Sequence, residues 1–249
     1  MIVKNKNLPK TTAIIVAAGT STRMASSPDT SDIIDKIFAP INGKPVLLWS
    51  LEAFQNTESV DEIIVVTRLE SINKIREFKV PKVINIVSGG TNRAQSVLCG
   101  LNEITHNEGI VAVHDGARPM VTPVLIDKVI SAAITHKAAI PAIAIRDTVK
   151  VACDGFVQST LDRNMLYAAQ TPQAFDLQLY REIIKSQNTP ESSAVAATDD
   201  SMLAEQLGIK VKIVEGDSRN IKITVQEDLV ITQAFKNQER TNRHAADFI

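Results

Sequence analysis

Two segments of the chain place small residues beside charged side chains in an order that suits phosphate binding. The first begins Ala17-Ala18-Gly19, directly after the apolar run 12–16, and continues to Arg23. Small side chains let backbone amides approach a phosphate, and the guanidinium of Arg23 matches the geometry of phosphate oxygens. The loop lacks the Gly-x-Gly-x-x-Gly pattern of dinucleotide-binding folds and the Gly-Lys-Ser/Thr ending of a P-loop. The pattern predicts a phosphate-binding turn, with a tight turn carrying a solvated arginine as an equal alternative.

The second segment contains His114, Asp115, Gly116 and Arg118 and follows the apolar run 110–113. A carboxylate at the end of a strand can hold ribose hydroxyls or a metal ion, and an arginine beside it can hold a phosphate. The alternative is an Asp–Arg ion pair that only braces the loop. We favour a functional role for Asp115 and Arg118, and a hydrogen-bonded structural role for His114.

Three further polar segments interrupt apolar stretches. Residues 162–164 read Asp-Arg-Asn, residues 169–173 read Ala-Gln-Thr-Pro-Gln, and residues 220–224 read Asn-Ile-Lys-Ile-Thr. Each is compatible with an ordinary loop, and a lysine such as Lys222 usually extends its ammonium into solvent. Residues 198–200, Thr-Asp-Asp, are most simply a helix N-cap followed by an acidic first turn.

The elements that must position these segments alternate between short apolar runs and longer amphipathic ones. Strands are expected at 12–16, 63–67, 83–87, 110–113, 138–145 and 210–214. Helices are expected at 45–54, 69–78, after Thr91 as a cap, from 123, over 175–185, from 198, and after a capping box at 224–227. Several strands are apolar throughout, which is typical of parallel strands covered on both faces. We therefore predict an α/β fold with a mostly parallel sheet flanked by helices. Residues 188–197 are the expected flexible loop, and the polar tail after Phe235 is expected to fray.

Residues 148–161 break this rhythm. Residues 149–151 and 156–161 alternate apolar and polar side chains around the turn Asp154-Gly155, which predicts a β-hairpin. A hairpin inserted into a doubly wound fold is expected to be an arm, lying over a site or against a partner subunit.

Composition limits the class of function. With 249 residues the chain is predicted to form a single domain, 1–249, and a net charge of −1 with 4% aromatic residues argues against nucleic acid as a partner. Two cysteines provide no disulfide framework and no Cys-x-x-Cys metal motif. The N-terminal apolar run 13–18 is too short for a secretory signal, and no stretch is long enough for a membrane helix. We expect a cytoplasmic protein that does not enter a membrane.

Taken together, the motifs resemble one family. Nine segments occur in that family's order, from about residue 12 to about residue 235. They are VAAGTSTRM, INGKPVLLWSLEAF, SGGTNRAQSV, VHDGARP, IRDTVK, DRN, QTPQAF, TDDS and VEGDSRNIKIT. The chain resembles the 2-C-methyl-D-erythritol 4-phosphate cytidylyltransferases of the non-mevalonate isoprenoid precursor pathway. The resemblance implies a Rossmann-like nucleotidyltransferase fold and a homodimer whose hairpin arms interlock.

The implied reaction joins CTP to a polyol phosphate and releases diphosphate, with Mg²⁺ held mainly by the CTP phosphates and no protein metal cage. By resemblance, Arg23 and Lys36 would stabilise charge on the triphosphate, and Arg163 and Lys222 would position the attacking phosphate. The other implied substrate-binding residues are Ala17, Ala18, Gly19, Gly90, Thr91, Ser96, Asp115, Gly116, Arg118, Thr148, Thr171 and Thr198. Gly90, Thr91 and Ser96 would lie near cytosine, and the polyol phosphate would lie among Asp115, Arg118 and the last three threonines.

The chain departs from the family pattern around the triphosphate loop. Ser21 replaces a glycine, the usual Pro-Lys-Gln is residues 35–37, Asp-Lys-Ile, and the loop 25–35 is long and contains Asp29, Asp32 and Asp35. Thr91 replaces an acidic residue common beside cytosine. Two alternatives to the implied function are a ribitol-5-phosphate cytidylyltransferase and a non-catalytic nucleotide-binding module.

Overall fold

An eight-stranded, mostly parallel sheet forms the centre of the protein. The computed structural model describes residues 8–19, 35–186 and 199–246, with side chains as far as residue 241. The strand order is β10-β7-β11-β6-β1-β4-β5, and β12 also pairs with β7. The strands are β1 (Thr11–Ala17), β4 (Glu62–Thr67), β5 (Val83–Ser88), β6 (Ile110–Asp115), β7 (Ala138–Ala144), β10 (Tyr167–Ala169), β11 (Gln173–Asp176) and β12 (Lys212–Glu215). The predicted fold class is confirmed.

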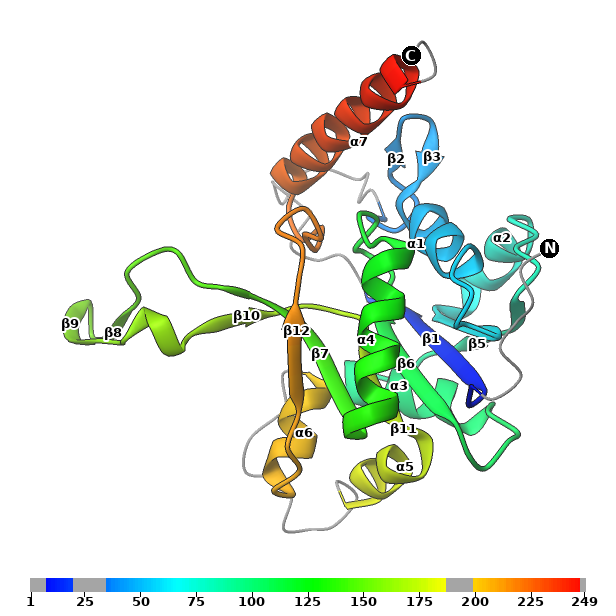
Figure 1. Ribbon diagram of the computed structural model, residues 1–249. Coiled ribbons are helices and arrows are strands. Elements are labelled where there is room, and N and C mark those ends of the chain that lie inside the picture. Colours follow the sequence, from blue (N-terminus) through cyan, green and yellow to red (C-terminus); the bar gives the residue numbers. More distant parts are fainter. Residues whose placement is uncertain (1–7, 20–34, 187–198, 247–249) are drawn as a thin grey trace.

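Helices cover both faces of this sheet (Figure 1). One face carries α1 (Val46–Gln55), α4 (Pro123–His136) and α2 (Ile72–Arg76), which follows the 3₁₀ turn η2 (Leu69–Ser71). The opposite face carries α3 (Arg93–Asn102), α5 (Leu177–Ser186) and α6 (Asp200–Gln206). On β1, Ile15 packs into the first layer and Ile14 into the second, so both side chains are fully buried. Burial on two faces is the physical reason for the uninterrupted apolar strands.

Two short strands make the sheet partly antiparallel. The sequence predicts a helix from Phe175 onward, and this is wrong at its start, because Phe175 belongs to β11. This strand lies between β6 and β7 and runs antiparallel to both, with Phe175 paired to Val111 and Ala138. The helix α5 begins only at Leu177. A four-residue strand has too few alternations to be separated from a helix start by its pattern.

The predicted hairpin is present as an arm. It consists of β8 (Lys150–Cys153) and β9 (Phe156–Thr160), joined by Asp154 and Gly155 with φ of 51° and 82°. Positive φ at both central positions is the geometry of the tight hairpin turn that Asp-Gly favours. The 3₁₀ turn η3 (Arg163–Met165) follows, and β10 returns the chain to the sheet. Every residue of β8 and β9 is exposed, and the arm extends well away from the sheet (Figure 1).

Two helix caps differ from prediction. Asn92, not Thr91, caps α3, because its side chain accepts from the amide of Gln95 at 2.9 Å, while the Thr91 hydroxyl donates to the Gln95 side chain. Ahead of α7, the carboxylate of Asp228, one residue beyond the expected glutamate, accepts from the amides of Thr224 and Val225.

The C-terminal helix α7 (Gln226–Ala246) continues through the stretch that was expected to fray, and that prediction is wrong. Lys236 lies 4.4 Å from the Trp49 ring and 3.3 Å from Glu239, which also pairs with Arg219. These contacts tie a polar helix to α1 and to the segment before Asn220. Gln233 of α7 also donates to Asn42, in the turn between β2 (Pro40–Ile41) and β3 (Lys44–Pro45). Within the described residues, no helix is both long and apolar enough to span a bilayer.

Candidate functional site

A pocket of about 460 Å³ opens at the carboxyl ends of the central strands. Ligands of open α/β sheets bind at this edge. The pocket brings together nine of the residues predicted for the site: Ala17, Ala18, Gly19, Lys36, Gly90, Thr91, Ser96, Asp115 and Lys222. Its other lining residues are Val16, Ile37, Arg68, Asn92, Arg93 and Ala117.

The turn after β5 forms one wall of this pocket and must lack side chains. A Cβ added to Gly89 would lie 2.6 Å from the Ala18 Cβ and 2.7 Å from the Ser96 Oγ. Only glycine therefore lets the turn pack against the first loop. The amide of Gly90 donates to the Ser96 Oγ at 3.2 Å, which orders the backbone that faces the pocket. The hydroxyls of Thr91 and Ser96 donate within the protein, so the wall can offer their oxygens to a planar ligand as hydrogen-bond acceptors.

A buried carboxylate surrounded by cations lies at the base of the pocket. Asp115 is only 7% exposed, and its oxygens lie 2.9 Å from Lys222 Nζ, 3.4 Å from Arg93 Nε and 3.7 Å from Arg118 Nε. Burial alone would raise the pKa of Asp115, but Lys222 and Arg93 outweigh it and hold that pKa well below its usual range. Arg93 also pairs with the buried Asp200, so two carboxylates face three cations, and the excess of one positive charge favours an anionic ligand.

Arg93 connects this pocket to the helical layer behind it. Its Nη2 lies 2.7 Å from Asp200, a carboxylate that is 1% exposed and that also accepts from the Tyr180 hydroxyl at 2.6 Å. Burial by itself lowers the pKa of Arg93, but Asp200 and Asp115 raise it above its ordinary value. The guanidinium is therefore a fixed positive charge at the pocket.

His114 stands directly behind Asp115 and is fully buried, with its ring 5.0 Å from that of Phe54. Burial lowers the pKa of His114 to about 3, so the imidazole is neutral. Its Nδ1 lies 3.0 Å from the Thr171 Oγ1, which accepts from the Asp115 amide at 3.1 Å. This arrangement orients Asp115 and agrees with the structural role expected for the histidine.

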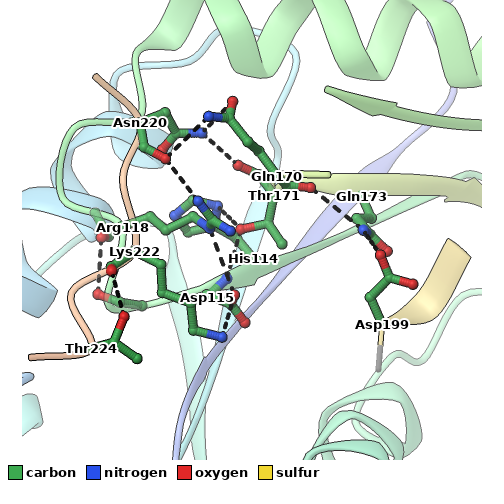
Figure 2. A network of polar contacts seen from close by, with 12 residues as sticks. His114, Asp115, Arg118, Gln170, Thr171, Gln173, Asp199, Asn220, Lys222 and Thr224 are labelled. Carbon is green, nitrogen blue, oxygen red and sulfur yellow. Dashed lines mark hydrogen bonds and ion pairs between the residues drawn. The ribbon is translucent and has the colours of Figure 1, made fainter. Parts of the chain in front are cut away.

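Lys222 is carried by a segment that is held tightly on either side (Figure 2). Before it, Asn220 is fully buried and donates through Nδ2 to the Thr171 carbonyl at 2.9 Å, while the Asn220 carbonyl accepts from Arg118 at 2.7 Å. After it, the amide of Ile223 donates to the Ala117 carbonyl at 2.8 Å. The lysine side chain thus leaves a fixed backbone.

Lys36 lies in a turn that the core anchors. The neighbouring Ile37 is 2% exposed, and its carbonyl accepts from the Leu47 amide at 2.9 Å. Asp35, the acidic departure beside Lys36, forms an ion pair with Arg68, which itself lines the pocket. The negative charge of Asp35 is therefore compensated by an arginine that directly follows β4.

The structure does not bring every predicted residue to this pocket. Thr148 and Arg163 are exposed residues of the arm region, where Arg163 donates to the Arg146 carbonyl at 3.1 Å. Arg23 and Thr198 lie outside the described residues, as do Asp29, Asp32, residues 25–34 and the whole predicted loop 188–197.

Three predicted residues lie behind the pocket wall. Gly116 donates to the Val16 carbonyl and accepts from Ser50, so both of its backbone groups are used within the protein. Arg118 donates through Nη1 to the Asn220 carbonyl and lies 3.7 Å from Asp115, and the Thr171 hydroxyl accepts from the Asp115 amide.

Four residues of the site were missed in the sequence. Arg68 and Arg93 line the pocket, while Gln170 and Asn220 support the segment that carries Lys222. Arg93, Gln170 and Asn220 lie inside motifs that carry the family resemblance, so the motifs indicated the region. Their roles depend on contacts with residues that lie 47 to 107 positions away in the sequence, and the local spacing of residues does not reveal such contacts. Among the described residues, no group of three histidine, cysteine or acidic side chains could hold a metal ion.

Comparison with known proteins gives a consistent result. Residues 11–238 match the family IspD, 2-C-methyl-D-erythritol 4-phosphate cytidylyltransferase. The chain is 44% identical over 229 residues to the enzyme of that name from Caldanaerobacter subterraneus, covering 90% of this chain and 97% of the relative. It is 40% identical over 240 residues to that of Lachnoclostridium phytofermentans, covering 94% and 99%.

Solved structures agree. The 4-diphosphocytidyl-2C-methyl-D-erythritol synthase of Anaerococcus prevotii matches with a TM-score of 0.79 at 34% identity, covering 92% of this chain and 96% of that chain. The enzyme from Francisella tularensis matches with a TM-score of 0.75 at 29% identity, covering 90% and 98%. With a family match over nearly the whole chain and a pocket that gathers its motifs, this protein belongs to the 2-C-methyl-D-erythritol 4-phosphate cytidylyltransferase family.

Proposed function

We propose that this protein transfers the cytidylyl group of CTP to 2-C-methyl-D-erythritol 4-phosphate and releases diphosphate, in the non-mevalonate isoprenoid precursor pathway. A phosphate oxygen of the polyol attacks the α-phosphorus of CTP in line. A new O–P bond forms as the bond to diphosphate breaks, and the electron pair leaves with diphosphate. The observation that carries the proposal is the convergence of Lys36, Lys222 and Arg93 on a pocket walled by the family's glycine-rich turns.

The charge balance of the pocket suits this chemistry. Phosphoryl transfer requires that the protein position the two substrates and neutralise the negative charge that develops on the phosphates. Lys36 is assigned to the triphosphate, together with Arg23. Lys222 is assigned to the attacking phosphate, because Asp115 holds its ammonium at the base of the pocket. Gly90, Thr91 and Ser96 form the wall assigned to cytosine.

Mg²⁺ is proposed to enter with CTP. Among the described residues, Asp115 is the one carboxylate that lines the pocket, and three cations already surround it. The residues present therefore fit an ion bound largely by phosphate oxygens and water. When bound, Mg²⁺ neutralises charge on the phosphates, while the orientation of CTP falls to the backbone of residues 17–19 and to Lys36.

We also propose a homodimer formed through the arms. Phe156 is 78% exposed and Val157 64% exposed on an isolated two-stranded ribbon, which is only marginally stable in water without a covering surface. A second copy of the chain supplies such a surface. Since Arg163 and Thr148 lie on this arm region rather than in the pocket, we assign them to a site shared between the two copies.

We propose a cytoplasmic location, because the free thiols Cys99 and Cys153 are typical of a reducing compartment.

A matrix of substrates tests the proposal. Purified protein is incubated with Mg²⁺, one of the four common nucleoside triphosphates, and either 2-C-methyl-D-erythritol 4-phosphate or ribitol 5-phosphate, and diphosphate release is measured. We expect turnover with CTP and the methylerythritol phosphate. Preferential turnover of ribitol 5-phosphate, or no diphosphate release in any combination, would refute the proposed function.

A further inference from the structure

Gln170 follows β10 and is 4% exposed, and its side-chain amide bonds to a distant segment of backbone. Its Nε2 donates to the Asp217 carbonyl at 2.8 Å, and its Oε1 accepts from the Asp217 amide at 3.2 Å. One side-chain amide thus pairs with both backbone groups of a single residue, as a neighbouring strand would. The same Nε2 lies 3.4 Å from the Asn220 carbonyl, so its contacts extend toward Lys222.

The absence of a side chain at Gly216 leaves room for the side-chain amide of Gln170. A Cβ added there would lie 2.5 Å from the Gln170 Oε1 and 3.2 Å from Ile143 and the Ala142 backbone. The amide of Gly216 donates to the Ala142 carbonyl at 2.9 Å, so β7 holds the start of the segment in place. A side chain at 216 would push the amide of Gln170 away from Asp217.

The segment from Gly216 to Ile223 is therefore held at several places. β7 holds Gly216, and Gln170 holds Asp217. Asn220 is held by Gln170 together with Thr171 and Arg118, and the Ala117 carbonyl holds Ile223. Lys222 lies between the last two of these points, and its side chain is 36% exposed with its ammonium on Asp115. A lysine has a flexible four-carbon stem, so its ammonium is held at one position only when the backbone that carries it is fixed.

We propose that Gln170 is a positioning residue of this site, whose buried amide clamps residues 216–220 and thereby fixes where Lys222 delivers its charge. The proposal rests on the proposed function, because that function assigns the attacking phosphate of the substrate to Lys222. Gln170 is not among the residues that line the pocket, so it acts on the reaction through the segment that carries Lys222. Loss of the amide should therefore displace Lys222 while leaving the wall around Gly90 and Ser96 intact.

The test combines Gln170→Met with Lys222→Ala. Methionine keeps the length and volume of glutamine but makes none of the amide bonds. We expect Gln170→Met to lower kcat at least tenfold, since a displacement of about 1 Å can cost on the order of 10² in rate, with the KM for CTP within about twofold of wild type. In the Lys222→Ala background the same change should have almost no further effect on kcat. If Gln170 mattered only for the fold, the losses in kcat of the two single variants would multiply in the double variant, and that result would overturn the proposal.

Gln55→Met is the matched control. The Gln55 Oε1 accepts from the Lys82 backbone amide at 2.8 Å, a bond of the same kind at the opposite edge of the sheet. We expect wild-type kcat from this variant, and an equal loss in both variants would overturn the proposal. Urea unfolding verifies that each variant is folded. If Gln170→Met does not fold, Gly216→Ala is used with the same expectations, because its methyl group displaces the Gln170 amide directly. An inactive wild type would instead refute the proposed function, and this proposal with it.

Discussion

Replacement of Asp115 by asparagine should destabilise the protein in a way that depends on pH. The carboxylate is 7% exposed and faces Lys222, Arg93 and Arg118 at 2.9, 3.4 and 3.7 Å. Removing one partner of a buried ion pair costs about 3–5 kcal/mol, because the remaining charge stays buried without compensation. Asparagine keeps an oxygen that can accept from Lys222, so we expect a loss near the lower end, about 3 kcal/mol, at neutral pH. For a chain of this size that lowers Tm by roughly 6–12 °C.

The sign of the pH dependence follows from the depressed pKa of Asp115. The group contributes stability above the ordinary carboxyl pKa of about 4, and this contribution disappears as pH falls further, because the unfolded chain takes up the proton first. Between about pH 7 and about pH 5 the difference between wild type and Asp115→Asn in urea unfolding should stay constant, because Asp115 is ionised in both the folded and the unfolded chain. It should shrink as pH falls below about 4, where only the unfolded chain takes up the proton.

The control for this prediction is Glu52→Gln, which removes an ion pair with Lys44 at 2.5 Å whose side chains are about one-third exposed. Such surface pairs contribute about 0–1 kcal/mol. A loss in Asp115→Asn no larger than in this control, or a difference that does not change with pH, would refute the account of the buried cluster.

Three further predictions concern Lys36, His114 and the arm. Lys36→Ala should lower kcat on the order of 10²-fold while changing the KM for CTP little, because its charge matters most as diphosphate departs; a kcat close to wild type would remove Lys36 from the mechanism. Burial lowers the pKa of His114 to about 3, so the free energy of unfolding should fall as pH drops from about 6.5 toward 3. His114→Gln should flatten that slope in urea titrations, and an unchanged slope would contradict the assignment. Arg163→Ala and Lys222→Ala should each keep only a small, measurable residual activity as homodimers but regain about a quarter of wild-type activity when refolded as a mixture, because half of the dimers are then mixed and each holds one intact shared site. No regain, or a chain that stays monomeric in a sizing experiment at micromolar concentration, would refute the shared site.

Much of the fold could be predicted because its causes are local. Apolar strands such as 110–113 indicate burial on both faces, Asp154-Gly155 indicates a tight hairpin turn, and Thr122-Pro123 indicates a helix start. All three predictions are confirmed by the structure. Local patterns failed where tertiary contacts decide. Phe175 joins a strand because β6 and β7 leave room for one between them, and α7 continues past Phe235 because Lys236 and Glu239 find partners on distant segments.

The candidate site divides in the same way. The sequence by itself determined the residue types that suit a triphosphate and a phosphate nucleophile, their order along the chain, and hence the family, since these depend on chemistry and spacing. Only the tertiary structure decided which of them meet. It placed Lys36, Asp115 and Lys222 in one pocket, placed Arg163 on an exposed arm, and added Arg93 and Gln170 through contacts that span many residues of sequence. The physical reason is that electrostatic and hydrogen-bond partners act over a few ångströms of space, and distance in space is set by how the sheet and its helices pack rather than by position in the chain.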